Sequence, residues 1–216
     1  KIILTASGGA FRDTPLKELK RVTSKDALKH PNWKMGEKIT VDCATMINKA
    51  FEIAEAKWLY NTSFDKIDVI IHRESIIHSM VEYSDNSVIA QMSYPDMELP
   101  IQLALTYPDR LKSNIRGLNF AEIGKLTFEK VDHERYPCFN LAVEALKRGG
   151  AYPAVLNGAN EEAVKLFLCD KIRYMDIYSC IYGALEAFNG KYDGEFESLS
   201  AANEFGFNYV RSKFGE

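Results

Sequence analysis

A short stretch in the first quarter of the chain carries several side chains that could do chemistry. Residues 40 to 52 read TVDCATMINKAFE and bring together two acids, a thiol, an amide and an amine: Asp42, Cys43, Asn48, Lys49 and Glu52. Asn48 and Glu52 would share a helix face, with Lys49 one step round. Unpaired N–H groups and the helix dipole in the first turns of such a helix also attract negative charge. The stretch therefore predicts an anion site.

Glu52 has two interpretations. Magnesium and similar hard cations bind oxygen ligands and take few of them from the protein, so a carboxylate beside an anion grip could be a metal ligand. A single helical glutamate is also a common ion-pair partner or solvated charge. No second carboxylate is obviously placed beside it in the sequence, and both interpretations stay open.

Cys43 depends on where the helix begins. We expect a strand over residues 38 to 42, KITVD, and a helix from near Cys43 to about Tyr60. A thiol at a helix N-terminus has a lowered pKa and could act as a nucleophile. The alternative, which we favour, is a small apolar residue that fills a strand-to-helix corner.

Two loops before this stretch could also face a ligand. Residues 1 to 6 predict a strand that stops at Ser7, Gly8 and Gly9, whose N–H groups could hold an anion, although a plain tight turn explains them better. Residues 29 to 38 predict a loop that either closes over a ligand or packs on the domain. Its notable side chains and its glycine are His30, Trp33, Met35 and Gly36.

The remaining elements must position these loops. Strands are expected at 68 to 72, 76 to 83 and 87 to 94, and an apolar helix at 101 to 107. A short helix capped by Thr14 is expected after the first loop, and a later helix is expected to begin at the asparagines of NGANEEAVKLFLCDK. The helix after Cys43 should bury one face, formed by Met46, Ile47, Ala50, Phe51, Ala54 and Trp58.

This pattern predicts the α+β class. A mixed-sheet catalytic domain is expected over residues 1–106, a linker over 107–132, and a small C-terminal helical bundle over 133–216. His72 and His78 lie on strand-like segments, and their spacing does not match a local zinc site.

Composition limits the function classes. The 216 residues carry a formal charge of −3, which argues against nucleic acid as the main partner. The four cysteines are widely spaced, as in a reducing compartment, and no apolar run has the length of a membrane span. Because the chain opens at KIILTAS, inside a strand and without an initiator methionine, we expect a piece of a longer protein.

Several ordered motifs together resemble one enzyme family. TASGGAFRDTP, HPNWKMGEKITVD, ATMINKAFE, IIHSMVEY and YPDMELPI, followed by YPCFNLAVEA and LNGANE, cover almost the whole chain. The likeness is to 1-deoxy-D-xylulose 5-phosphate reductoisomerase. It implies isomerisation of that sugar phosphate and its NADPH-dependent reduction to 2-C-methyl-D-erythritol 4-phosphate, on Mg²⁺ or Mn²⁺, in isoprenoid precursor synthesis.

The resemblance also assigns residues. It implies that the substrate phosphate is held by Ser7, Asn48, Lys49 and the side chain at position 43. His30 would lie beside the substrate, with His30 and Glu52 as catalytic residues and Glu52 as one of three acidic metal ligands. Trp33 and Met35 would belong to a lid loop, and Gly36 would approach the cofactor. A homodimer in the bacterial cytoplasm or the plastid stroma is implied too.

Two departures from the family pattern matter. The family has serine where this chain has Cys43. In addition, the cofactor-binding domain and an Asp-Ser-Glu segment with the other two metal ligands should precede Lys1, and no glycine-rich cofactor turn occurs within these residues. We therefore expect this polypeptide alone to be inactive.

Two other functions remain open at this point. A semialdehyde-type dehydrogenase would use Cys43 as a covalent nucleophile and would also place its catalytic domain after a cofactor domain. A non-catalytic interaction module would keep the fold without the activity.

Overall fold

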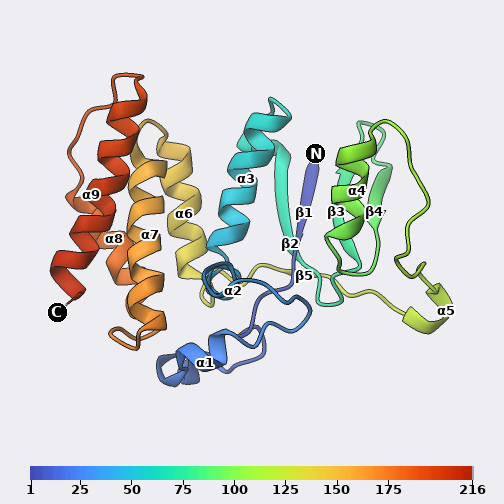
Figure 1. Ribbon diagram of the computed structural model, residues 1–216, viewed down its shortest axis with the longest axis horizontal. Helices are drawn as coiled ribbons and strands as arrows, with labels where there is room; N and C mark the ends of the chain where they lie inside the picture. Colours follow the sequence, from blue (N-terminus) through green and yellow to red (C-terminus); the bar gives the residue numbers. More distant parts are fainter. Residues whose placement is uncertain (216) are drawn as a thin grey trace.

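The computed structural model describes residues 1–215, and Figure 1 shows its arrangement. Its elements alternate briefly between strands and helices and then become helical. In chain order they are β1 Ile2–Ala6, the 3-10 helix η1 Leu16–Arg21, α1 Ser24–Ala27, α2 Glu37–Thr45, α3 Ile47–Leu59, the 3-10 helix η2 Phe64–Lys66, β2 Ile67–Ile71, β3 Ile77–Glu82, β4 Val88–Met92, α4 Glu98–Thr106, α5 Phe120–Ile123, β5 Glu129–Lys130, α6 Pro137–Arg148, α7 Tyr152–Leu168, α8 Asp176–Ala187 and α9 Phe196–Phe214.

The strands form one mixed sheet in the order β4-β3-β1-β2-β5. β1 pairs with β2 in parallel, so the chain between them must cross over the sheet, and α2 and α3 make that crossover. The other strand pairs are antiparallel. The sheet and the helices together confirm the predicted α+β class.

The expected strand at 38 to 42 is wrong, because those residues lie in α2. Ile39, Thr40 and Val41 are β-branched, which is typical of strands. In the fold Thr40, Val41, Ala44 and Thr45 recur at helical spacing and are buried, so packing overrides the local preference. The single helix expected from Cys43 to Tyr60 is therefore two helices, α2 and α3.

The helices after residue 133 form a bundle on the far side of α3 (Figure 1). α7 lies at its centre and contacts α6, α8 and α9. α7 and α9 approach closely at two glycines: a Cβ on Gly158 would lie 1.8 Å from the Asn203 carbonyl oxygen, and one on Gly206 would lie 2.3 Å from that of Val155. Side chains at these positions would push the two helices apart.

A single hydrophobic cluster runs through sheet and bundle, from Ala6 in β1 to Val210 in α9. α3 joins the two parts because it contacts β1 and β2 as well as α6. Within residues 107–132, expected to be a linker, α5 forms and β5 adds an edge strand beside β2. The division at residues 106 and 132 stays a prediction.

Three smaller expectations are also wrong. Trp58 is expected in the buried face of α3, but this residue is 76% exposed in the last turn of the helix. Asn157 and Asn160 do not cap α7, which begins earlier, at Tyr152, with Pro153 in its first turn. Thr14 is not the cap of η1, whose N-cap is Pro15. Among residues 1–215, no helix has both the length and the apolar character to cross a membrane.

Candidate active site

A cavity of about 610 Å³ opens between the sheet, the two loops after β1 and the α2–α3 junction. It gathers nearly all the residues singled out in the sequence. Those that line it are Ser7, His30, Trp33, Met35, Cys43, Asn48, Lys49 and Glu52. Gly36 does not line it, and lies instead at the N-cap of α2.

The junction between α2 and α3 orients one wall. Met46 breaks the helix because its backbone is left-handed, with φ of 60°. α3 then starts at Ile47, so Asn48 and Lys49 fall in its first turn, where backbone N–H groups have no partner inside the helix. The Ile47 N–H donates to Thr45 Oγ1 at 3.4 Å, and the N–H groups that follow it favour an anion, as the sequence predicts for this stretch.

Three side chains on this wall interact with one another. Asn48 Nδ2 donates to Glu52 Oε1 at 2.7 Å, and Lys49 Nζ forms an ion pair with Glu52 Oε2. The Lys49 side chain is 12% exposed and that of Glu52 is 33% exposed. The Asn48 amide and the Lys49 amine therefore satisfy the Glu52 carboxylate, and all three side chains still border the cavity. We call Asn48, Lys49 and Glu52 the cavity cluster.

Cys43 lies in the last turn of α2, so the expected position at a helix N-terminus is wrong. Burial raises the pKa of its thiol to about 12; the charge of Lys49 opposes that shift, while Glu52 and Asp42 add to it. A thiol with this pKa is protonated at neutral pH. The physical basis for a Cys43 nucleophile is therefore missing.

α2 is fixed from behind by a second polar group, at its contact with α7. Lys38 Nζ lies 2.8 Å from Asp42 Oδ2 and 2.7 Å from Glu161 Oε1, and Asn160 Nδ2 donates to Asp42 Oδ1 at 2.9 Å. Burial raises the pKa of Asp42, and the nearby Lys38 opposes the rise. We call Lys38, Asp42, Asn160 and Glu161 the interface cluster.

The opposite wall carries Ser7 and His30. His30 Nε2 lies 2.9 Å from Ser7 Oγ, and the Gly9 N–H donates to the same oxygen at 3.1 Å. Gly9 has φ of 67°, and a Cβ there would lie 2.5 Å from the Cys43 carbonyl oxygen. Only glycine lets this turn lie so close to α2. Burial, followed by the charge of Arg12, lowers the pKa of His30.

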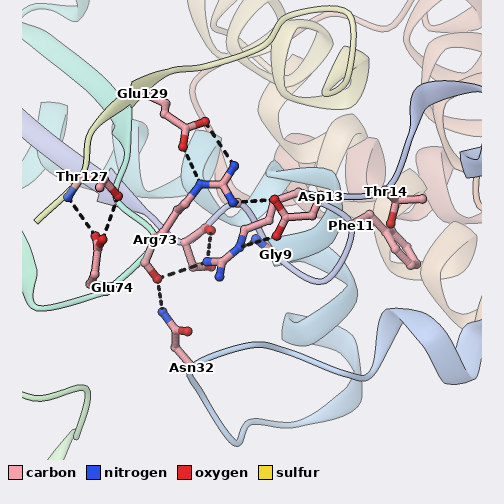
Figure 2. Close-up of polar contacts among 12 residues, drawn as sticks. Gly9, Phe11, Asp13, Thr14, Asn32, Arg73, Glu74, Thr127 and Glu129 are labelled. Carbon is pink, nitrogen blue, oxygen red and sulfur yellow. Dashed lines mark hydrogen bonds and ion pairs between the residues drawn. The ribbon is translucent and has the colours of Figure 1, made fainter.

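The turn between β2 and β3 anchors both loops (Figure 2). Asn32 Nδ2 donates to the Arg73 carbonyl and to Ser75 Oγ, both at 2.6 Å. Arg12 Nη1 donates to the carbonyls of Ser7 and Arg73, at 3.0 and 3.1 Å. The Arg73 side chain forms ion pairs with Asp13 and with Glu129 of β5. The first loop, the second loop and the edge of the sheet are thereby tied to one turn.

The two strand histidines differ. His72 is buried and satisfied, because Nδ1 donates to the Thr127 carbonyl and Nε2 accepts from the Ile76 N–H. His78 lines the cavity, where its ring packs edge-on against Trp33 at 6.0 Å. Its Nε2 also lies 3.1 Å from the Ser93 carbonyl.

The sequence assigned no site role to several lining residues, His78 among them. They are Lys34, Ser75, His78, Gln91, Ser93, Asp96 and Met97. Most lie on strand ends or loops, where period-two alternation does not say which face borders a ligand. The signal for Asp96 is an acid that directly follows a proline, in the loop after the strand expected at 87 to 94.

The described residues do not by themselves form a complete metal site. Within 1–215, no group of three His, Cys, Asp or Glu side chains comes together. Glu52 is one hard oxygen ligand and is paired with Lys49. A magnesium ion held by the protein at this point would need further carboxylates from elsewhere.

Comparison with known proteins gives consistent matches. Residues 1–60 match the 1-deoxy-D-xylulose 5-phosphate reductoisomerase C-terminal domain, and residues 92–206 match the DXP reductoisomerase C-terminal domain. Over 97% of this chain and 54% of its own length, 1-deoxy-D-xylulose 5-phosphate reductoisomerase 1 of Bacillus thuringiensis subsp. konkukian is 52% identical. The reductoisomerase of Acetivibrio thermocellus is 55% identical over 92% of this chain and 52% of its own.

Solved structures give matches to the same family. The reductoisomerase from Zymomonas mobilis in complex with NADPH superimposes with a TM-score of 0.90 and 40% identity, over 98% of this chain and 55% of the other. A DOX-P reductoisomerase in complex with NADPH, fosmidomycin and magnesium gives a TM-score of 0.93 and 37% identity, over all of this chain and 55% of the other. The chain spans about half the length of the relatives it matches. As its motifs predict, it belongs to the 1-deoxy-D-xylulose 5-phosphate reductoisomerase family.

Proposed function

We propose that this chain supplies the substrate-binding half of an enzyme that isomerises 1-deoxy-D-xylulose 5-phosphate and reduces it, with NADPH, to 2-C-methyl-D-erythritol 4-phosphate. One observation carries the proposal. A single cavity joins Ser7 and His30 on one wall to Asn48, Lys49 and Glu52 on the other, below the loop that bears Trp33.

In this proposal the substrate phosphate lies at the start of α3. Asn48, Lys49 and the N–H groups of the first turn donate from one side, and Ser7 donates from the other. Cys43 adds a weak donor where a serine is usual in the family. A charge-assisted grip on a phosphate that does not react lends binding energy to the orientation of the reacting carbons.

Glu52 is proposed as one ligand of Mg²⁺ or Mn²⁺, with two further acidic ligands from outside residues 1–215. The bound ion would polarise the carbonyl and hydroxyl oxygens of the substrate. The relative solved with NADPH, fosmidomycin and magnesium supports this choice of cofactors. Gly36, outside the cavity at the start of α2, is proposed to approach NADPH.

Trp33 and Met35 are proposed as the lid. Both line the cavity from the loop at 30 to 36, and the edge-on contact between Trp33 and His78 holds this loop over the sheet. A lid of large apolar side chains would exclude water from the reacting carbons.

We also infer a homodimer. The outer edge of the sheet and the nearby α4 expose a group of large apolar side chains, which are Val88, Ile89, Ile101, Leu105 and Tyr107. β4 is an edge strand in the described sheet, so it could also pair with another chain. Sedimentation analysis of Ile89→Lys tests this, with a monomer expected.

The two relatives named above are bacterial, which favours the bacterial cytoplasm over the plastid stroma.

A fusion tests the proposed activity. The part of the Bacillus relative that precedes the matched region would be joined to Lys1, and NADPH oxidation measured with the sugar phosphate and Mg²⁺. We expect turnover that depends on the sugar phosphate, on Mg²⁺ and on NADPH, and no turnover from the 216-residue chain alone. Oxidation that needs no metal but stops on alkylation of Cys43 would favour a semialdehyde-type dehydrogenase. Absence of turnover and of phosphate binding would favour an interaction module.

A further inference from the structure

The position of the proton on His30 follows from its neighbours. Nδ1 accepts from the backbone N–H of Trp33 at 2.9 Å and from that of Asn32 at 3.2 Å. A backbone N–H can only donate, so Nδ1 carries no proton. A ring whose Nδ1 accepts hydrogen bonds is not the cation, and burial, which lowers the pKa of His30, favours the same neutral form. The one ring proton is therefore on Nε2.

This tautomer fixes the role of the Ser7 hydroxyl. Nε2–H must donate to Ser7 Oγ across the 2.9 Å contact, and the Gly9 N–H donates to the same oxygen at 3.1 Å. A serine oxygen has two acceptor lone pairs and one hydrogen. Both lone pairs are thereby engaged, and Ser7 has only its hydrogen to offer to a ligand in the cavity it lines.

We propose that His30 is a positioning residue that couples the loop at 30 to 36 to the anion site and makes Ser7 an obligate hydrogen-bond donor. The relay runs from the Trp33 N–H to His30, from His30 to Ser7, and from Ser7 to the ligand. It selects a ligand group that only accepts at this point, such as a phosphate or phosphonate oxyanion. The ligand class rests on the proposed function; the direction of the relay does not.

Both ends of the relay are anchored to the same turn. Asn32, which follows His30 in the loop, donates its amide to the Arg73 carbonyl and to Ser75 Oγ. The carbonyl of Ser7 accepts from Arg12 Nη1, which also bonds the Arg73 carbonyl. A shift of either loop would therefore stretch the bonds at His30. This geometry also implies reciprocity, because an anion that polarises Ser7 strengthens the bonds that hold the loop.

Two substitutions separate the two ends of His30. In His30→Asn the side-chain oxygen can replace Nδ1 and hold the loop N–H groups, but the donor to Ser7 is lost. In His30→Gln the amide nitrogen can reach Ser7, but the acceptor for the loop is lost. Ser7→Ala removes the final donor and leaves His30 in place, which makes it the matched control.

The experiment uses the 216-residue chain labelled with ¹⁵N, inorganic phosphate as the probe, and NMR. We expect the Nε2–H tautomer of His30 in the free chain, and slower exchange of the Trp33 amide hydrogen when phosphate binds. Ser7→Ala should weaken phosphate binding by about tenfold, the size of a hydrogen bond to a charged group. His30→Asn should weaken binding by a few fold with Trp33 protection kept, whereas His30→Gln should weaken binding less than His30→Asn does, with Trp33 protection lost.

Two results would overturn the relay. One is an Nδ1–H tautomer of His30 in the wild-type chain. This measurement does not depend on the folding of any variant. The other is that His30→Asn and His30→Gln change phosphate affinity equally and also change Trp33 amide exchange equally. Equal changes are expected if the His30 ring only contacts the ligand. If the wild-type chain binds no phosphate, the proposed substrate class fails, while the tautomer and the exchange data from the free variants still decide the relay.

Discussion

The cavity cluster and the interface cluster use the same chemistry in different surroundings. Each pairs a lysine with a carboxylate and adds an asparagine amide. In the interface cluster, Asp42 is 2% exposed and both its oxygens are bonded, so no ligand can reach it. In the cavity cluster, Lys49 and Glu52 border an open volume of about 610 Å³.

This difference shows that access, and not residue type, separates a binding group from a structural one. The same short sequence holds members of both clusters: Asp42 points to α7, whereas Lys49 and Glu52 point to the cavity. Substitutions in the cavity cluster should change ligand binding and turnover. Substitutions in the interface cluster should change the free energy of unfolding.

The largest effect is expected at Glu52. In the fusion with a cofactor domain, Glu52→Gln should lower kcat by about a thousandfold, equivalent to about 4 kcal/mol, because a neutral amide is a poor ligand for a divalent ion. Its thermal midpoint should stay close to that of the parent, and phosphate should bind at least as tightly, since Lys49 is freed. Near-parental turnover at saturating Mg²⁺ would remove Glu52 from the proposed metal site.

At the interface cluster, Lys38→Met should lower the free energy of unfolding by about 3 kcal/mol, because it leaves Asp42 buried without its counter-charge. Urea denaturation measures this. The matched control is Lys29→Met, which removes an exposed ion pair with Asp26 and should cost less than about 1 kcal/mol. Equal losses in the two variants would mean that the interface cluster stabilises no more than a surface pair.

The pH dependence of stability gives a smaller signature of the buried acid. Because burial raises the pKa of Asp42, the folded chain takes up a proton at a pH where the unfolded chain is still ionised. As the pH falls from neutral through the folded-state pKa, wild-type stability should therefore rise relative to Asp42→Asn. Urea titrations at several pH values would show it. If the difference in stability between the wild type and Asp42→Asn stays constant with pH, or moves in the opposite direction, the assigned effect of burial on Asp42 is wrong.

The smallest effect is expected at Cys43. Replacing the thiol by a hydroxyl supplies a better donor to the proposed phosphate, so Cys43→Ser should tighten phosphate binding by a few fold. Cys169→Ser, at an exposed thiol, is the control and should change nothing. In the fusion, a drop in kcat of several hundredfold for Cys43→Ser would instead support a thiol nucleophile.

Much of the site could be predicted because it depends on motifs that are continuous in sequence. Asn48, Lys49 and Glu52 lie within two turns of one helix, and Ser7 directly follows the first strand. The sequence placed His30, Trp33 and Met35 in one loop that either closes over a ligand or packs on the domain, and the family likeness assigned them their proposed roles. Nothing in the local sequence shows that Met46 adopts a left-handed backbone, since methionine is not a usual residue there. That break places Cys43 in the last turn of α2 and not at the start of a helix.

Long-range contacts explain the other errors. Residues 38 to 42 carry a β-branched run that is typical of a strand, and this local preference is overridden because Val41 and Ala44 pack in the core as part of α2. The partner of Asp42 is Asn160, more than a hundred residues away, so a buried role for this acid could not be derived from its neighbours. The part of Arg73 in anchoring both loops also depends on three distant segments, as Figure 2 shows.

The most direct test compares two sugars that differ only in the phosphate. Calorimetry would measure the binding of 1-deoxy-D-xylulose 5-phosphate and of 1-deoxy-D-xylulose to the wild-type chain, to Lys49→Met and to Lys38→Met. If the cavity cluster is the phosphate site, the wild type and Lys38→Met will bind the phosphorylated sugar at least about tenfold more tightly, the size of one charged hydrogen bond, and in Lys49→Met this preference will be much smaller. Equal affinity of the wild type for the two sugars, or equal loss in the two lysine variants, would contradict the account.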